Sequence, residues 1–394
     1  MKPTSGQRRL LLRRLLGLGP FGIALGGCSA IDTVSGWMPW SSSRAKRPEL
    51  APLATPNQLS AAWRLSVGAT GLGFVPVLSG SQLLLANRAG QVAAHDAQSG
   101  ERLWSFQHTV GFSSGIAVAD QLMVLASRDG RVIAFDRSGN RLWSAVLGAE
   151  AVSVPALGEG LVVVRTSDSR IQAIDIESGR PRWSVVRQSP PLVLRATNLA
   201  VFRSGRVYLG LPGGRLISVN VLNGQVDWEA SVSTPRGTTE VERLADVLGA
   251  PIVGEDDVVA LSFQGKLSSF ERTTGQLLWS RELAGSGGVA GDRQQLVAAD
   301  DRGTVHAFSR GGAPQWKQEA LRGRSLGAPA LSARHVLIAD DQGLLHALSR
   351  DQGNLLGRLE LPAKVLACAP LIDDSRAWVL GVEGSLMQIR IASA

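Results

Sequence analysis

The chain has 394 residues, among them 45 glycines, 10 tryptophans and two cysteines, and its formal net charge is +8 at pH 7. Five positive charges lie before residue 28, and the remaining +3 is too small a basic excess to indicate nucleic-acid binding. Two cysteines exclude a disulfide-stabilised framework, and the length is ample for a large hydrophobic core.

Residues 1–27 have the pattern of an export signal. A basic start precedes an apolar run at 15–25, which is too short to remain as a membrane span. The run leads into Leu-Gly-Gly-Cys, ending at Cys28, which resembles a bacterial lipobox. This resemblance implies that Cys28 is acylated and holds the mature protein on a membrane. Because Ser29 rather than an aspartate follows, we expect the outer membrane, with the protein facing the periplasm. An ordinary secretory signal with an incidental cysteine is the alternative.

Residues 28–58 are expected to form a flexible tether between the lipid and the folded domain. They are rich in serine and proline, which is typical of an extended linker. The predicted organisation is a signal peptide at 1–27, a lipidated tether at 28–58 and one repeat domain at 59–394.

A short unit recurs through the rest of the chain. It consists of an apolar strand, a turn, a second strand and a polar end, as in residues 90–96 and 130–136. A second turn and a further strand follow, with a Trp four residues after the turn Gly. Periods of about 40 residues indicate repeat architectures such as β-propellers. The eight units begin at Gly90, Gly130, Ser169, Gly214, Gly265, Gly303, Gly343 and Gly384.

The offset between units and Trp strands predicts how the ring closes. Six units carry the Trp strand, the seventh has Gly357 in the Trp position, and the eighth ends with the chain. The missing outer strand lies upstream of the first unit, around Trp63. An N-terminal strand that completes the last blade leaves no open seam. We therefore predict an all-β fold, an eight-bladed β-propeller of four-stranded antiparallel blades closed by an N-terminal strand.

No pattern of catalytic or metal-binding residues stands out. His306 and His346 occupy equivalent positions, but in different units, so a shared metal is not indicated. The paired aspartates lie where strands enter turns and are expected to be solvated turn residues rather than calcium ligands. The Trp series is expected to pack between blades, with a ligand-stacking ring as the alternative. Cys368 is expected to be a buried, apolar thiol.

The unit Gly-x-φ-x-Ala-φ-Asp-x-x-Ser/Thr-Gly-x-φ-φ-Trp at 90–104 and 265–279 resembles the repeat of pyrroloquinoline-quinone (PQQ) propellers. With the lipobox, the length and the eight units, the chain resembles the BamB family of lipoproteins, which belong to the outer-membrane β-barrel assembly (BAM) complex. PQQ dehydrogenases use a vicinal disulfide and a calcium-bound carboxylate cluster. This sequence lacks a Cys-Cys pair, so no cofactor is expected.

Two segments resemble the loops by which this family docks on BamA. They contain Leu192, Leu194 and Arg195 in the first loop and Asp246 in the second. The resemblance implies apolar anchors at Leu192 and Leu194, a charged donor at Arg195, and Asp246 as its acidic counterpart or a separate polar contact. The family often has a second acid where this chain has Leu248, which puts an acid-mediated contact there in doubt.

The repeat spacing points to the same region independently. The two longest intervals between Trp positions bracket Trp228, so insertions are expected within 184–206 and 229–257. Extra loop length in one sector suggests a binding surface. The alternative is that Leu192 and Leu194 are strand residues that face the core.

The resemblance implies a non-catalytic lipoprotein scaffold that supports assembly and insertion of β-barrel proteins into the outer membrane. Its expected partners are BamA, other BAM subunits and, through acylated Cys28, outer-membrane lipid. Unfolded outer membrane proteins are a further candidate partner, and nucleic acid is not. The alternative is a periplasmic PQQ-dependent enzyme or small-ligand sensor that uses the central channel. Such an enzyme should gather charged or aromatic groups there.

Overall fold

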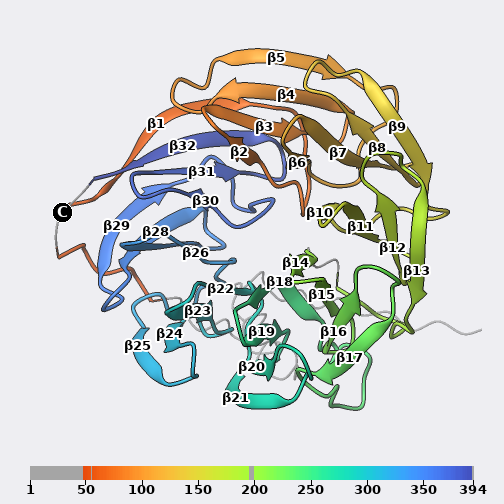
Figure 1. Ribbon diagram of the computed structural model, residues 1–394. Coiled ribbons are helices and arrows are strands. Elements are labelled where there is room, and N and C mark those ends of the chain that lie inside the picture. Colours follow the sequence, from red (N-terminus) through yellow and green to blue (C-terminus); the bar gives the residue numbers. More distant parts are fainter. Residues whose placement is uncertain (1–47, 55, 195–198, 393–394) are drawn as a thin grey trace, which may run out of the picture. The chain divides into compact units, whose positions relative to one another are not determined.

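The computed structural model describes residues 48–54, 56–194 and 199–392, which belong to one compact unit. Their strands form eight four-stranded antiparallel sheets that stand around a ring like the blades of a propeller (Figure 1). The predicted eight-bladed β-propeller is therefore confirmed. The described part of the chain contains no helix with the length and apolar character to cross a bilayer. Cys28 lies outside the described residues.

Each blade runs from an inner strand to an outer strand in sequence order, except the last. The strands of blades 1 to 4 are β2 (Val77–Ser79), β3 (Gln82–Ala86), β4 (Gln91–Asp96), β5 (Arg102–Gln107); β6 (Ala117–Ala119), β7 (Leu122–Ser127), β8 (Arg131–Phe135), β9 (Arg141–Val146); β10 (Ala156–Gly158), β11 (Leu161–Arg165), β12 (Arg170–Asp175), β13 (Pro181–Val186); β14 (Val201–Arg203), β15 (Arg206–Leu211), β16 (Arg215–Asn220) and β17 (Val226–Ser231).

Blade 8 takes its outer strand from the beginning of the domain. The strands of blades 5 to 8 are β18 (Val247–Val253), β19 (Asp257–Ser262), β20 (Gly265–Glu271), β21 (Leu277–Leu283); β22 (Val289–Gly291), β23 (Gln295–Ala299), β24 (Val305–Ser309), β25 (Pro314–Gln318); β26 (Ala330–Leu331), β27 (His335–Ala339), β28 (Leu344–Ser349), β29 (Leu355–Glu360); β30 (Leu371–Ile372), β31 (Arg376–Leu380), β32 (Ser385–Ile391) and β1 (Leu59–Ser66).

The closing strand β1 pairs antiparallel with β32, from Leu59 opposite Ile391 to Ser66 opposite Ser385. Backbone hydrogen bonds extend the pairing beyond both ends, since Val67 N donates to Gly384 O and Ala392 N to Gln58 O. In Figure 1 the red and blue ends of the propeller lie side by side in one blade. The predicted offset closure is confirmed.

The core lies between blades because the two central strands of each blade are covered on both faces. In β7, Val124 and Ala126 pack with Val162 and Val164 of blade 3, whereas Leu125 packs with the cluster that includes blade 1. Successive strand residues point to opposite faces, so alternate side chains fill alternate interfaces. The apolar runs of the sequence are therefore buried on both sides.

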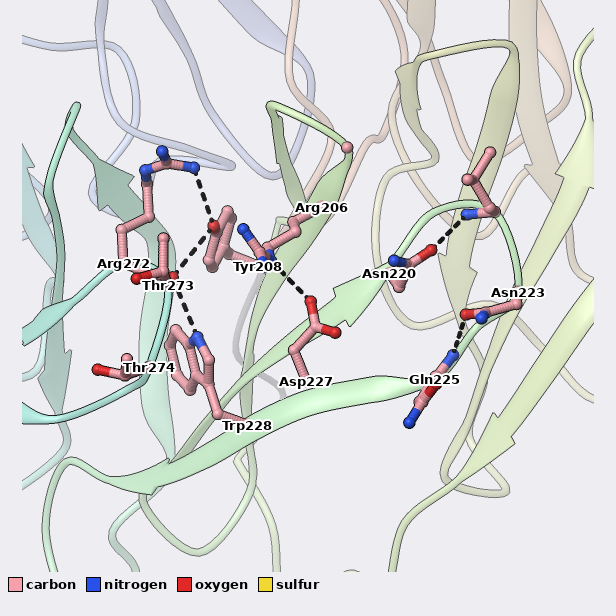
Figure 2. Close-up of polar contacts among 12 residues, drawn as sticks. Arg206, Tyr208, Asn220, Asn223, Gln225, Asp227, Trp228, Arg272, Thr273 and Thr274 are labelled. Carbon is pink, nitrogen blue, oxygen red and sulfur yellow. Dashed lines mark hydrogen bonds and ion pairs between the residues drawn. The ribbon is translucent and has the colours of Figure 1, made fainter.

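At most interfaces between blades, a Trp of the outer strand packs against the turn of the next blade; we call this contact the Trp lock. A Cβ on Gly275 would lie 2.6 Å from Trp228 of the preceding blade, so only glycine leaves room for the ring. The Trp228 Nε1–H donates to the carbonyl oxygen of Arg272, 3.0 Å away, and Tyr208 donates to the same oxygen over 3.3 Å (Figure 2). The same Trp-to-turn hydrogen bond recurs from Trp63, Trp143, Trp183, Trp279 and Trp316.

Two blades depart from this lock. In blade 1, Phe106 rather than Trp104 covers the turn glycine of the next blade, Gly139. In blade 7, Gly357 faces blade 8, whose third and outer strands come from opposite ends of the domain and are joined by no turn. A Cβ on Gly357 would meet Asn57 Oδ1 at 2.8 Å and Leu59 Cγ at 2.9 Å. The entering N-terminal segment thus takes the place of the missing Trp.

Candidate protein-docking site

The two longest links between blades lie side by side in the blade order. Residues 187–200 join blade 3 to blade 4, and residues 232–246 join blade 4 to blade 5. The corresponding links at 108–116 and 147–155 are shorter. The extra length that the Trp spacing predicted thus falls in these two links. We call the face that carries the links between blades the connection face.

The first link presents its apolar residues to solvent. Leu192 is 40% exposed and the adjacent Val193 is 43% exposed, while Leu194 is half-buried. None of the three belongs to a strand, so they do not face the core as strand residues would. We call residues 192–194 the docking segment. Sequence reasoning missed Val193, whose signal was its position between the two leucines.

Asp246 holds the docking segment in place from inside the protein. Its side chain is 1% exposed, and its Oδ2 accepts the backbone N–H of Leu194 at 2.6 Å. Its Oδ1 accepts the backbone N–H of Gly213 at 2.9 Å. One buried carboxylate therefore joins both long links to a turn of blade 4. Arg195 lies outside the described residues, so its predicted pairing with Asp246 stays a prediction.

Arg165, at the end of β11, faces the Asp246 carboxylate. Burial lowers the pKa of Arg165, and the negative charge of Asp246 opposes that shift. A buried carboxylate with two backbone donors and a nearby guanidinium is well compensated for its lost hydration. Asp246 is thus a positioning residue here. Sequence reasoning missed Arg165, because the repeat pattern gives no sign that a residue of blade 3 lies near the link between blades 4 and 5.

The second link is ordered by its own polar side chains. Glu242 accepts the backbone N–H groups of Thr238 at 2.8 Å and Thr239 at 3.1 Å, and these hydrogen bonds lower its pKa. The Arg243 guanidinium donates to the Gly237 carbonyl oxygen. Val241 is exposed at this link. The exposed Val241 side chain therefore lies on a loop that its own hydrogen bonds keep ordered.

Leu248, where the family often has an acid, is not exposed as Leu192 and Val193 are. It is buried in β18, where it pairs with Leu261 of β19. The leucine is therefore consistent with local packing.

The ring encloses a cavity of about 590 Å³ on the connection face, which we call the central cavity. Its walls are mainly apolar residues and glycines from the links into blades 4, 6, 7, 8 and 1 and from β18 of blade 5, and they include no aromatic side chain. The charged residues among them are Asp340, Asp341 and Lys364. The charged and aromatic convergence expected of a channel enzyme is not seen among these lining residues.

Asp340 belongs to a buried polar cluster beside the central cavity. Its Oδ2 accepts hydrogen bonds from Arg324 at 2.7 Å and His346 at 3.0 Å. Burial would raise the pKa of Asp340, but hydrogen bonds from His346 and from the Leu344 backbone outweigh it and bring the pKa to about 2. Burial lowers the pKa of His346, and Asp340 opposes that shift. These side chains already bond to one another.

The equivalent His306 bonds in the same way to Asp300 of its own blade, at 3.0 Å. Among the described residues, no three His, Cys, Asp or Glu side chains converge so that they could hold a metal ion. Cys368 lines the central cavity as a half-buried residue, and burial raises the pKa of its thiol to about 12. A thiol with that pKa stays protonated near neutral pH and is a poor nucleophile.

Comparison with known proteins identifies relatives of this chain. The family model described as "Outer membrane protein assembly factor BamB" matches residues 88–311 and 301–394. The outer membrane protein assembly factor BamB of Bordetella pertussis is 36% identical over 371 residues, which cover 93% of this chain and 94% of that protein. The BamB of Burkholderia pseudomallei is 33% identical over 331 residues, covering 83% of this chain and 87% of that protein.

Solved structures share the fold at lower identity. The crystal structure of BamB from Moraxella catarrhalis matches with a TM-score of 0.75 at 23% identity, covering 84% of this chain and 100% of that one. A quinohemoprotein alcohol dehydrogenase from Comamonas testosteroni matches with a TM-score of 0.66 at 13% identity, covering 89% of this chain and 80% of that one. At these identities the likeness concerns the fold alone.

Proposed function

This chain belongs to the family of outer membrane protein assembly factor BamB, and we propose that it acts as a non-catalytic lipoprotein scaffold of the BAM complex. In this role it would bind BamA and support the assembly and insertion of β-barrel proteins into the outer membrane. The function in the name of its relatives supports this proposal. No residue of the docking segment or the central cavity is assigned a catalytic role.

The observation that carries the proposal is the construction of the docking segment. The side chains of Leu192 and Val193 are partly exposed to solvent, and the backbone of their loop is hydrogen-bonded to the buried Asp246. Apolar side chains on a fixed backbone lose little conformational freedom when a partner covers them, which makes them effective interface anchors. Arg195 follows directly and would supply a charged donor for the partner.

The anchoring proposal rests on the sequence, since residues 1–47 lie outside the described residues. Cys28 would carry the lipid, and the propeller would face the periplasm from the inner leaflet of the outer membrane. Residues 57 and 58 already bond to β29, because the Asn57 side chain donates to Arg358 O and Gln58 N to Leu356 O. A tether would thus leave the propeller beside blade 7.

The docking proposal is tested by measuring the affinity of the purified full chain for the periplasmic domains of BamA. Leu192→Ala should weaken binding by about tenfold or more, since truncating an anchor typically costs ~2 kcal/mol. The matched control is Leu222→Ala, because Leu222 is 80% exposed in the turn between β16 and β17, on the opposite face. Equal affinities of both variants and the unaltered chain would place the interface elsewhere.

A further inference from the structure

The central cavity has the size and lining of a binding pocket that the docking segment does not account for. Its volume of about 590 Å³ lies within the ~300–1,000 Å³ typical of ligand pockets. Leu72 and Val365 line it, and they are 55% and 53% exposed. Large apolar side chains that remain exposed around a cavity on one face indicate a surface that another molecule covers.

Gly327 provides a second observation. Its φ lies outside the left-handed region, and a Cβ there would have only Ala339 O nearby, at 3.6 Å, which is an ordinary contact. Neither backbone conformation nor packing therefore requires glycine at this position. Gly327 lines the central cavity, and a side chain there would occupy it. A glycine that neither the backbone conformation nor the packing requires leaves room for a group of another molecule to approach the backbone closely.

The central cavity and the docking segment draw on the same link of the chain. Leu199, from the same link as the docking segment, lines the cavity, and so does Leu248, two residues after Asp246. Asp246 bonds directly to Leu194. The cavity thus shares the first link with the docking segment, and it shares the connection face, while β18 begins directly after Asp246. A protein seated on Leu192 and Val193 therefore approaches the face on which the cavity opens.

We propose that the central cavity receives a bulky apolar side chain of the same protein partner that docks on residues 192–194. This inference rests on the proposed function, because it takes BamA as the partner. The chemistry of the cavity specifies the inserted group. Walls made mainly of leucine, valine, alanine and glycine favour a leucine, methionine or phenylalanine side chain over a charged one, because most of the lining offers no hydrogen-bond partner.

The test measures the affinity of the full-length lipidated chain, in detergent, for the periplasmic domains of BamA. Gly327→Leu should place a side chain inside the cavity, take up part of the space for an inserted group and lower the affinity at least tenfold. Gly311→Leu is the matched control, because a Cβ on Gly311 also meets open space, with φ outside the left-handed region, but in the turn between β24 and β25 on the opposite face. It should bind as the unaltered chain does.

Val365→Asp, at the exposed rim, gives an independent measurement should Gly327→Leu fail to fold, and it should also weaken binding at least tenfold. If Leu192→Ala weakens binding while well-folded Gly327→Leu and Val365→Asp do not, the cavity inference is wrong and the docking proposal stands. If Leu192→Ala has no effect, the docking proposal fails first. The binding of a β-strand peptide of alternating apolar residues is measured as well. If a cavity variant binds this peptide more weakly but binds BamA as the unaltered chain does, the cavity serves unfolded clients and the inference is wrong.

Discussion

At the scale of single residues, the acid of the proposed docking site bonds to the backbone. Asp246 is buried and accepts two backbone N–H groups, so its contribution is the placement of Leu192 and Val193 rather than a contact of its own. A surface residue could be replaced with little effect on stability. A buried acceptor cannot, because its removal leaves both donors without partners.

We therefore expect Asp246→Ala to lower both stability and partner binding. Leaving the Leu194 and Gly213 N–H groups without an acceptor should cost about 1–3 kcal/mol in the free energy of unfolding. Urea unfolding and BamA affinity are the measurements. Asp227→Ala, which removes only a solvent-accessible pair with Arg206, is the control and should cost ~1 kcal/mol or less. A variant as stable as the unaltered chain would contradict the positioning role.

The Asp340 cluster predicts a dependence of stability on pH. The folded pKa of about 2 lies below the ordinary 3.8, so this carboxylate stabilises the fold above pH ~4 and loses that contribution as pH falls towards 2. The shift corresponds to roughly 2 kcal/mol. Unfolding free energies between pH 5 and 2 should therefore fall more steeply in the unaltered chain than in Asp340→Asn. Parallel curves would show that Asp340 makes no such contribution.

At the scale of elements, the blades are joined by two kinds of lock. Most interfaces close when a Trp ring covers the turn glycine of the next blade and donates to a turn carbonyl. Blade 8 has no such turn, and Asn57 and Leu59 occupy the position at Gly357. At the seventh unit, Gly357 leaves the space in which Asn57 and Leu59 of the entering segment pack.

Gly357→Trp should restore the repeat consensus and yet destabilise the propeller. The ring would displace Asn57 and Leu59 and so weaken the pairing of β1 with β32, at a cost of about 3 kcal/mol, the upper end for overpacking. Thermal unfolding gives the measurement. Gly311→Trp, in an open turn, is the control and should unfold near the unaltered chain. An equally stable Gly357→Trp variant would show that the seam accommodates a Trp lock.

At the scale of the whole molecule, the binding features share one face. The docking segment and the central cavity both lie on the connection face, while residues 57 and 58 leave the propeller beside β29. The docking surface and the proposed membrane attachment are thus separate parts of the chain. A scaffold that binds a membrane-bound partner needs both.

Cys28→Ala tests the attachment. If Cys28 is acylated, the variant should lose incorporation of labelled palmitate and leave the outer-membrane fraction, because the propeller has no other proposed anchor. The melting temperature of the propeller should stay unchanged, since Cys28 is not part of the unit of residues 47–394. Continued lipid labelling together with outer-membrane fractionation would contradict the assignment of Cys28.

The sequence by itself determined the fold, the number of blades and the closure by an N-terminal strand. It could do so because each blade is built from short-range signals: alternating apolar residues, turn glycines and a Trp at a fixed spacing. The same spacing located the two long links that carry Leu192 and Asp246.

Only the tertiary structure decided what those residues contact. That Trp228 covers Gly275 of the next blade, that Gly357 faces Asn57, and that Asp246 bonds to Leu194 are contacts between segments distant in sequence. No local pattern encodes such contacts, because they depend on how eight similar units close into a ring. The central cavity is likewise a property of the closed ring, formed by β18 of blade 5 and by the links into blades 1, 4, 6, 7 and 8.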